Sequence, residues 1–264
     1  MIIGNPVEHS LSPAMHNVAY ENLKIDDQFV YLGSRVKVED VEKVVWAMRT
    51  MDNFHGLTCT IPHKVEVMKH LDQIDPIAKK IGSVNTVVKY GDILKGFNTD
   101  WLGVIIPLEK MVTLLDKKVL VLGAGGAARA IVYGLITRGA KVTIFNRTKE
   151  KAIVLAQEFK CSSGDLENQE VIKDFDIIIN TTSVGMKPLE KQTPIETKNI
   201  SKKHIVFDIV YVPFETKLLK EAKKRGARIV HGVEMLLHQG TAQFEIYTGH
   251  KAPEKVMRKV LNES

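Results

Sequence analysis

A glycine-rich stretch in the middle of the chain has the residue types and spacing that bind a phosphate chain. Gly123, Gly125 and Ala128 of "GAGGAA" match G-x-G-x-x-G/A, between an apolar run and a helical pattern as the motif requires. The first glycine permits a tight turn, the second lets backbone N–H groups approach a pyrophosphate, and the helix N-terminus adds its dipole. We therefore expect a dinucleotide site; the alternative is a glycine-rich turn that binds nothing.

The end of the next strand indicates which dinucleotide binds. In an NAD-binding unit an acidic residue about 20 positions after the first glycine takes the ribose hydroxyls. This chain has "FNRT" there, with Arg147 24 positions after Gly123 (147 − 123). A cation suits a 2′-phosphate, so the sequence predicts NADP. The alternative is a solvent-facing arginine at a strand end.

A lysine stands where a buried strand gives way to a helix. The stretch "LTCTIPHKVEV", residues 57–67, places Pro62, His63 and Lys64 where the helix should begin. Hydride delivery to a ketone makes an alkoxide that needs a proton, and oxidation of the alcohol needs that proton removed, which a positioned lysine can do. The alternative is an ordinary surface lysine. We interpret His63 as a pocket-rim residue and not as the base.

Strands and helices alternate through the first hundred residues. "QFVYLG", residues 28–33, predicts a strand, and residues 41–48 have apolar side chains at helical spacing behind Asp40, the expected N-cap. Ser12 and Pro13 predict the N-cap and first residue of a helix that runs through about Leu23. Further along, the patterns predict short helices in residues 63–71 and in residues 75–82, the second from Pro76 to a stop at Gly82, and a hairpin that turns at Gly91 and Asp92.

The middle of the chain reads as a doubly wound α/β fold. "KVLVLG" is the kind of apolar run that a parallel strand buried on both faces needs, a helix stopped by Gly139 follows, and "KVTIFN" is the next strand. "FDIIINTTS", "HIVFDIVY" and "ARIVHG" predict further strands with helices between them. Two helices are expected to end the chain.

Composition limits the other classes of function. The formal net charge is +6, but Lys and Glu alternate, as in "KVEDVEK", so we interpret the charge as solvated helix surface and expect no nucleic acid partner. No run of about 18 apolar residues and no signal-peptide pattern occurs in the 264 residues, so we expect no membrane partner and a cytoplasmic protein. Cys59 and Cys161 form no C-x-x-C pair and the nine histidines are scattered, so no metal site is expected.

Eight stretches occur in the order in which shikimate dehydrogenases have them, and together they span nearly the whole chain. They are "GNPVEHSLSPAMHN", "TIPHK", "GSVNTVV", "GFNTDWLG", "GAGGAARA", "NRT", "NTTSVGM" and "GVEMLLHQG". The chain therefore resembles the shikimate dehydrogenase family. The resemblance implies NADP-linked interconversion of 3-dehydroshikimate and shikimate, a step toward chorismate and the aromatic amino acids, by a monomer or homodimer.

The resemblance also implies a division of the α/β chain into two domains. An α/β substrate-binding domain would comprise residues 1–103 plus 236–264. A Rossmann-like, doubly wound NADP-binding domain, residues 104–235, would be inserted into it.

The resemblance assigns roles residue by residue. Lys64 and Asp100 would be the catalytic pair, with Lys64 either passing the proton itself or stabilising the oxyanion while water completes the transfer. For the substrate, the assigned residues are Ser10 and Ser12 at the carboxylate, Thr60, Lys64, Asn85, Asp100 and Gln239 at the ring hydroxyls and reacting group, and Tyr211, Met235 and Gln243 as further lining residues. For NADP, they are Gly123, Ala124, Gly125, Gly126 and Ala127 in the turn, Asn146, Arg147 and Thr148 after the second strand, Thr182, Ser183, Val184 and Met186 in the loop that borders the nicotinamide, and Gly232 and Met235. Taken singly, Ser12 could equally cap a helix and Met235 could equally be core.

One position departs from the family pattern, and two other functions stay open. Where many members have Asn-Val-Thr, this chain has Thr58-Cys59-Thr60, and one hydroxyl cannot replace the separate donor and acceptor of an amide. The alternatives are a paralogue that acts on quinate, with NAD, and a non-catalytic NADP sensor of the same fold. Loss of Lys64 or Asp100 would have favoured the sensor, and both are present.

Overall fold

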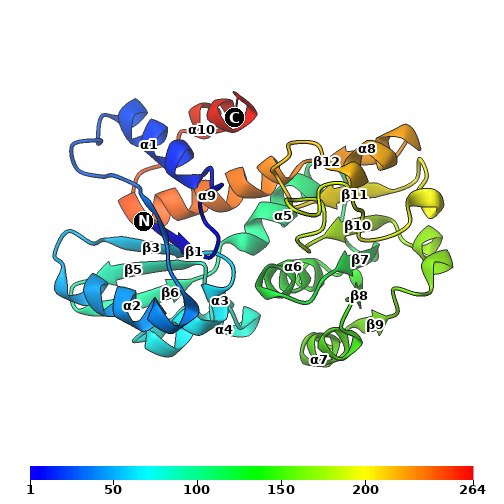
Figure 1. Ribbon diagram of the computed structural model, residues 1–264, viewed down its shortest axis with the longest axis horizontal. Helices are drawn as coiled ribbons and strands as arrows, with labels where there is room; N and C mark the ends of the chain where they lie inside the picture. Colours follow the sequence, from blue (N-terminus) through cyan, green and yellow to red (C-terminus); the bar gives the residue numbers. More distant parts are fainter. Residues whose placement is uncertain (264) are drawn as a thin grey trace. The chain divides into compact units, whose positions relative to one another are not determined.

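The computed structural model describes residues 1–263 (Figure 1). The chain divides into two compact units, the first made of Met1–Asp100 and the segment from Leu237 onward, the second of Trp101–Leu236. The chain leaves the first unit at the start of α5 (Asp100–Glu109) and returns to it within α9 (Gly232–Thr248). Each unit is built on its own six-stranded sheet.

The sheet of the first unit is mixed, with the strand order β2-β1-β3-β5-β6-β4. β3 joins the two halves of this sheet, because it pairs parallel with β1 and antiparallel with β5. In the antiparallel pair Thr58 lies opposite Thr86. The strands are β1 (Ile2–Gly4), β2 (Gly33–Arg35), β3 (Gly56–Cys59), β4 (Gln73–Ile74), β5 (Thr86–Tyr90) and β6 (Ile93–Phe97).

Helices cover both faces of this sheet, and the two faces differ in chemistry. Leu57 and Cys59 of β3 pack into an apolar cluster with α2 and α4, whereas Thr58 points to the opposite face, where α9 lies. Figure 1 shows α1 beside α10 on the same side of the sheet as α9. The helices of this unit besides α9 are α1 (Ser12–Leu23), α2 (Val41–Thr50), α3 (His63–Glu66), α4 (Pro76–Ile81) and α10 (Glu254–Glu263), with 3-10 turns at Val38–Asp40 and Val67–His70.

The second unit has an all-parallel sheet with the order β12-β11-β10-β7-β8-β9. The order reverses between β7 and β10, and the crevice at the carboxyl ends of such strands is where open α/β sheets bind ligands. The strands are β7 (Lys118–Leu122), β8 (Lys141–Phe145), β9 (Ser162–Gly164), β10 (Ile177–Asn180), β11 (Ile205–Asp208) and β12 (Arg228–Val230). The helices besides α5 are α6 (Gly126–Ile136), α7 (Lys149–Phe159) and α8 (Lys217–Lys224), with 3-10 turns at Gln169–Asp174 and Thr197–Asn199.

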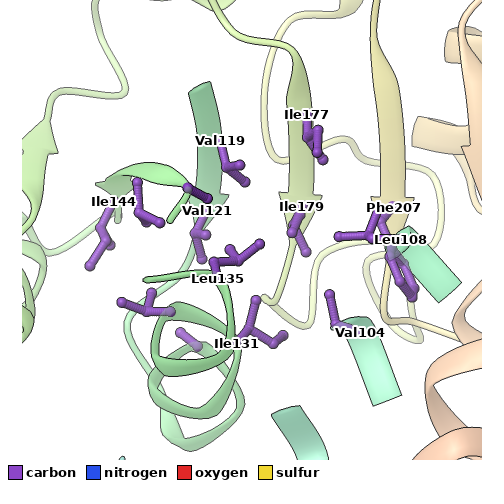
Figure 2. Packing of buried hydrophobic residues seen from close by; sticks show 14 of the residues in the cluster. Val104, Leu108, Val119, Val121, Ile131, Leu135, Ile144, Ile177, Ile179 and Phe207 are labelled. Atoms are coloured by element: carbon purple, nitrogen blue, oxygen red, sulfur yellow. The ribbon is translucent and has the colours of Figure 1, made fainter. Parts of the chain in front are cut away.

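Alternate side chains of these parallel strands supply two apolar cores. Figure 2 shows Val119, Val121, Ile177 and Ile179 pointing toward residues of α5 and α6. The residues between them, such as Ile178, pack on the other face against α8. A strand buried on both faces must be apolar along its whole length, which is why the runs "KVLVL" and "IIIN" read as continuous apolar stretches.

Most of the elements expected from the sequence are confirmed. Asp75 accepts the Ile77 N–H at the start of α4, and Gly82 ends that helix with φ +71°. The hairpin turns at Gly91, and the strand, glycine-rich turn, helix and strand around Gly123 follow in the expected order. The mixed α/β fold class is therefore confirmed.

The strand predicted for residues 28–33 is wrong. Residues 29–32 form no strand, and β2 begins only at Gly33. The Asn17 side chain takes the place of a neighbouring strand: its Oδ1 accepts from Tyr31 N at 2.7 Å and its Nδ2 donates to Tyr31 O at 3.0 Å. Tyr31 is thereby turned inward while Val30 and Leu32 stay exposed. We call residues 29–32 the strap. The alternation of apolar and aromatic residues reflects this segment and not a strand.

Of two predicted helix caps, the one at Ser12 is wrong and the one at Asp40 is confirmed in position only. Leu11 is the N-cap of α1 and Ser12 is its first residue, with no side-chain cap. Asp40 is the N-cap of α2, as predicted, but its carboxylate accepts from Lys43 Nζ at 2.7 Å and from no backbone N–H of the helix. A 3-10 turn at Val38–Asp40 leads directly into α2, and the Val38 carbonyl accepts the backbone N–H of Val41, the first residue of the helix.

A histidine lies in the core of the first unit without a polar partner. His16 is fully buried and stacks on Tyr31 with the ring centroids 4.3 Å apart. Among residues 1–263 neither of its ring nitrogens has a hydrogen-bond partner. Burial lowers the pKa of His16 from 6.5 to about 3. The ring is therefore neutral in the folded protein over the whole range in which it would titrate in the unfolded chain.

This buried ring predicts a pH dependence of stability. The unfolded chain binds a proton at His16 near pH 6.5 and the folded chain only near pH 3. The contribution of the neutral ring to the free energy of unfolding is therefore complete above pH 6.5 and is lost as the pH falls from 6.5 toward 3. His16→Phe keeps the stacking and should flatten the fall in the free energy of unfolding by about 1.4 kcal/mol per pH unit. Urea titrations from pH 4.5 to 7.5, with His250→Phe at an exposed position as control, measure it. An unchanged slope in His16→Phe would contradict the assignment.

Candidate active site

A lysine and an aspartate form a close, largely buried ion pair in the first unit. Lys64 Nζ lies 2.5 Å from Asp100 Oδ2, and their side chains are 12% and 4% exposed. A cation and an anion shielded from water attract strongly, but their burial is tolerated only when the remaining polar atoms are also satisfied. The groups around the pair therefore decide whether it can hold one geometry.

The backbone fixes both ends of this pair. Lys64 lies in the first turn of α3, and its carbonyl accepts from Val84 N at 2.8 Å, just before β5. Asp100 is the first residue of α5, and its backbone N–H donates to Asn98 Oδ1 at 3.0 Å. Asn98 Nδ2 in turn donates to the Ser83 carbonyl and hydroxyl. One buried amide thus ties the start of α5 to the segment that leads into β5.

The Asn85 side chain holds the second oxygen of the aspartate. Its Nδ2 donates to Asp100 Oδ1 and to Thr99 Oγ1, both at 2.9 Å. Its Oδ1 accepts from Thr99 N at 2.9 Å and from Thr86 Oγ1 at 2.8 Å. An amide has two donor hydrogens and two acceptor lone pairs, so Asn85 is fully used within the protein. The contacts therefore make Asn85 a group that orients Asp100.

Helix α9 extends this polar network along its inner face. Gln239 and Gln243 are one turn apart: Gln239 Oε1 lies 3.4 Å from Asn85 Nδ2, and Gln243 Nε2 donates to Thr86 Oγ1 at 2.9 Å. Two residues far apart in sequence, Asn85 and Gln239, thus meet beside the ion pair. Gln243 is fully buried and braces the strand, so its own amide nitrogen is already committed.

Two tyrosines hold the hydroxyl of Thr58, the position that departs from the family pattern. Tyr31 OH donates to Thr58 Oγ1 at 2.5 Å, and Tyr247 OH lies 2.7 Å from the same oxygen. Thr58 is thus tied to the strap before β2 and to the next turn of α9 after Gln243. Neither tyrosine is predictable from the sequence, because no spacing links residues 31, 58 and 247. The one signal for them in the sequence is that each places a hydroxyl group within an otherwise apolar segment.

The start of α1 offers a site for an anion. Ser12 is buried in its first turn, and Ser12 N donates to Ser10 Oγ at 3.3 Å. The first turn carries no acidic residue and no side-chain cap, so the positive end of the helix dipole is not neutralised there. Both hydroxyls and the helix start suit a carboxylate. Thr60 follows β3 and is half-buried.

The interpretation of His63 as a rim residue is wrong. Its side chain is fully buried, and its Nε2 lies 2.9 Å from the Val36 carbonyl. Burial lowers its pKa. His63 therefore anchors the start of α3 to the segment that follows β2, directly before Lys64.

The glycine-rich turn of the second unit fits a dinucleotide. Gly123 has φ +115°, which only glycine adopts readily, and a Cβ there would overlap the Thr181 hydroxyl. Gly125 is the N-cap of α6, and a Cβ there would have no atom within 4 Å, so the space above it is open. The helix has no acidic residue in its first turn. Backbone N–H groups, open space and a positive helix end are what a pyrophosphate requires.

The residues after β8 suit a second phosphate. Arg147 and Thr148 are exposed, and Thr148 is the N-cap of α7 without a side-chain hydrogen bond. Asn146 Nδ2 donates to Thr148 O at 2.8 Å and shapes this turn. An arginine beside a helix start offers both charge and N–H donors to a 2′-phosphate.

The remaining cofactor candidates of the sequence, and the substrate candidate Tyr211, lie in different places of the second unit. Loop 181–186 follows β10 at the strand-order reversal, and Thr181 N donates to Leu122 O across it. Tyr211 follows β11 and is half-buried. Gly232 begins α9 so close to the Val210 carbonyl that a Cβ would overlap it. Met235 is buried in the apolar core, so the core alternative holds for its packing.

Two kinds of site are not found among residues 1–263. No group of three or more His, Cys, Asp or Glu side chains could hold a metal ion there. No helix within these residues has the length and apolar character needed to cross a bilayer.

Family comparisons cover most of the chain. A family model described as the shikimate dehydrogenase substrate binding domain matches residues 2–87. One described as shikimate / quinate 5-dehydrogenase matches residues 107–218, and one described as the shikimate 5′-dehydrogenase C-terminal domain matches residues 232–261.

Individual proteins give the same result. The shikimate dehydrogenase (NADP(+)) of Methanosphaera stadtmanae is 43% identical over 259 residues, which cover 94% of this chain and 90% of that protein. A crystal structure of shikimate dehydrogenase in complex with NADP⁺ matches with a TM-score of 0.93 at 36% identity, covering 99% of this chain and 93% of that one. The enzyme of Thermus thermophilus in complex with NADP(H) and shikimate matches with a TM-score of 0.91 at 34% identity, covering 99% and 97%.

The saturated amide of Asn85 predicts a large effect of one isosteric change. Asn85→Asp removes both donors and sets a second carboxylate where Nδ2 now lies, 2.9 Å from Asp100 Oδ1. The free energy of unfolding should fall by about 3 kcal/mol at pH 7, since a buried acceptor loses its donor and faces a like charge. The repulsion raises the pKa of the introduced carboxyl, so the deficit should shrink as the pH falls toward 5.

Asn98→Asp provides the matched control for this change. Asn98 is similarly buried, but its Nδ2 faces Ser83 and not a carboxylate. Equal losses in the two variants, measured by urea titration, would mean that the contact with Asp100 contributes nothing.

Proposed function

The chain belongs to the shikimate dehydrogenase family, and we propose that it catalyses the NADP-dependent interconversion of 3-dehydroshikimate and shikimate through Lys64 and Asp100. The observation that carries this proposal is the ion pair of 2.5 Å between them, held by the saturated amide of Asn85. Three family models, matching residues 2–87, 107–218 and 232–261, support the assignment of the whole chain.

Lys64 is the group that manages the proton in this proposal. Reduction of the ketone leaves negative charge on its oxygen, and the ammonium of Lys64 neutralises it or supplies the proton. Asp100 holds the ammonium by one oxygen and is held by Asn85 through the other. The lysine therefore meets the reacting oxygen in a fixed position, which lowers the cost of orienting it during the reaction.

The first unit would bind the rest of the substrate. Ser10 and Ser12 at the uncapped start of α1 would take the carboxylate. Thr60 and Gln239 would take ring hydroxyls. Asn85 would act through Asp100, because its own amide is fully bonded. A pocket of short polar groups rejects analogues that leave those groups unpaired.

The second unit would hold the cofactor, which supplies or accepts the hydride when bound. Residues 123–127 would bind its pyrophosphate, and Asn146, Arg147 and Thr148 its 2′-phosphate. Loop 181–186 and Gly232 would border its nicotinamide end. We propose accordingly that the first unit is the substrate-binding domain and the second the NADP-binding domain. The free cysteines Cys59 and Cys161 suit a reducing compartment, so the cytoplasm is the proposed location.

Quinate is the second candidate substrate, because the family model over residues 107–218 is described for both acids. The absorbance of NADPH distinguishes the two when shikimate and quinate are each offered with NADP⁺ and with NAD⁺. We expect shikimate with NADP⁺ to give the highest kcat/KM. A higher kcat/KM for quinate would make quinate the substrate. The absence of a reaction in every combination of acid and cofactor would refute the proposal.

The ion pair predicts how single and double substitutions affect catalysis. Lys64→Ala should lower kcat by roughly 10² to 10⁴, the range for a positioned acid or base, with KM for shikimate changing much less. Because the two groups act as a unit, Lys64→Ala combined with Asp100→Ala should be little worse than the poorer single variant. Steady-state kinetics of the three variants in one buffer measures this.

Lys69→Ala is the matched control for these kinetics. Lys69 pairs with Glu66 at 2.7 Å in the same segment, but its side chain is 66% exposed. Its loss should leave kcat unchanged. A rise in KM at constant kcat in Lys64→Ala would make Lys64 a ground-state binding residue, and fully additive losses would mean that Lys64 and Asp100 act separately.

A further inference from the structure

A buried aspartate ends the strand next to the expected nicotinamide loop. Asp208 is the last residue of β11 and lies in register opposite Asn180, the last residue of β10. Asn180 in turn lies opposite Leu122, which precedes the glycine-rich turn. Both polar side chains are fully buried. They lie at the carboxyl ends of the strands, at the edge where the cofactor would bind.

The Asp208 carboxylate joins three segments of the second unit. Its Oδ1 accepts from Asn180 Nδ2 at 2.9 Å and from Val210 N at 3.1 Å. Its Oδ2 accepts from Thr216 Oγ1 at 2.7 Å, and Thr216 also caps the start of α8. One side chain therefore holds the ends of two strands and the start of a helix in a single arrangement.

Asn180 carries this arrangement into loop 181–186. Its Nδ2 also donates to Val184 O at 3.0 Å, and its Oδ1 accepts from Thr182 N at 3.0 Å and Thr182 Oγ1 at 2.7 Å. The amide is saturated by these contacts and the one to Asp208. Gly185 passes over the same point, since a Cβ there would lie 3.4 Å from Thr216 and 3.7 Å from Asp208 Oδ2.

Among the residues that the structure describes, burial of the Asp208 carboxylate is offset by hydrogen bonds alone. All its hydrogen-bond partners are neutral, and burial raises its pKa to about 6. The charged neighbours of Thr216 are engaged elsewhere: Glu215 pairs with Lys223 and His231, and Lys217 donates to the Lys191 carbonyl. A carboxylate whose pKa is raised on folding reduces stability at neutral pH.

We infer that Asp208 is a positioning residue that holds loop 181–186, through Asn180, in the shape that receives the nicotinamide end of the cofactor. The inference rests on the proposed function of this unit. The adenosine end is held elsewhere, by Arg147 and the glycine-rich turn, so Asp208 should matter for only one half of the cofactor. A residue needed merely for folding would affect both halves alike.

Two ligands separate these possibilities: NADPH, and adenosine 2′,5′-bisphosphate, which lacks the nicotinamide half. Their dissociation constants are measured by calorimetry for the whole chain and for Asp208→Ala, Asp208→Asn and Asp176→Ala. Asp176 is the matched control, because its Oδ2 accepts Lys118 N at 2.9 Å at the opposite end of the same sheet. Asn is the conservative replacement, since its oxygen can keep the two Oδ1 contacts while its NH₂ donates to the rotatable Thr216 hydroxyl.

Asp208→Ala should weaken NADPH by about tenfold or more, the usual effect of losing hydrogen bonds to a charged group, with adenosine 2′,5′-bisphosphate unchanged. Asp208→Asn should restore most of the NADPH affinity, and Asp176→Ala should alter neither ligand. Equal weakening of both ligands, or of neither, would overturn the inference. If Asp208→Ala does not fold, Asn180→Ala takes its place, because it removes the same hydrogen bond between Asn180 and Asp208. Its dissociation constants for the two ligands are judged by the same criteria. An unaltered chain that binds neither ligand would refute the proposed function itself.

Discussion

The contact between Lys64 and Asp100 is the constraint on which the first unit depends. A buried ion pair is tolerated only when desolvation is offset by further hydrogen bonds. Asn85, Asn98 and Thr99 supply or organise those bonds, and each comes from the segment on either side of β5 and β6. The hairpin, the start of α5 and the first turn of α3 are therefore set by one polar cluster. A chain that only needed a stable core would have placed apolar residues there.

A different constraint governs the second unit: the carboxyl ends of its parallel strands all lie at the same edge of the sheet. The side chains within β10 and β11 are apolar because helices cover both faces of the sheet, one of which Figure 2 shows. In these two strands a polar residue enters only at the last position, where Asn180 and Asp208 close the strands and shape the loops that follow. Glycines at 123 and 185, both with positive φ, then let the chain turn closely over this edge. These strands thus provide an apolar core along their length, and their carboxyl ends provide the edge at which we propose that the cofactor binds.

The sequence predicts what depends on local geometry and misses what depends on tertiary partners. Pro76 and Gly82 fix the ends of α4 through backbone preferences, so this helix was predictable. The glycine-rich turn was predictable for the same reason. Tyr31 was misread as part of a strand, because its backbone is held by the Asn17 side chain. The bracing of Thr58 by Tyr247, 189 residues away, has no signal in either segment alone. Asn85 could be placed at the site, but its saturation by Thr86, Thr99 and Asp100 required the contacts themselves.

Chemical rescue tests the central claim that the Lys64 ammonium acts on the reacting oxygen. Lys64→Ala leaves room for a small primary amine beside Asp100, and shikimate oxidation by NADP⁺ is followed as ethylamine and amines of different basicity are added. The account predicts that kcat rises with amine concentration toward a plateau. A rate that follows amine basicity would identify proton transfer, and one that does not would identify stabilisation of charge on the oxygen. No rise with any amine in a folded Lys64→Ala protein that binds shikimate would contradict the account.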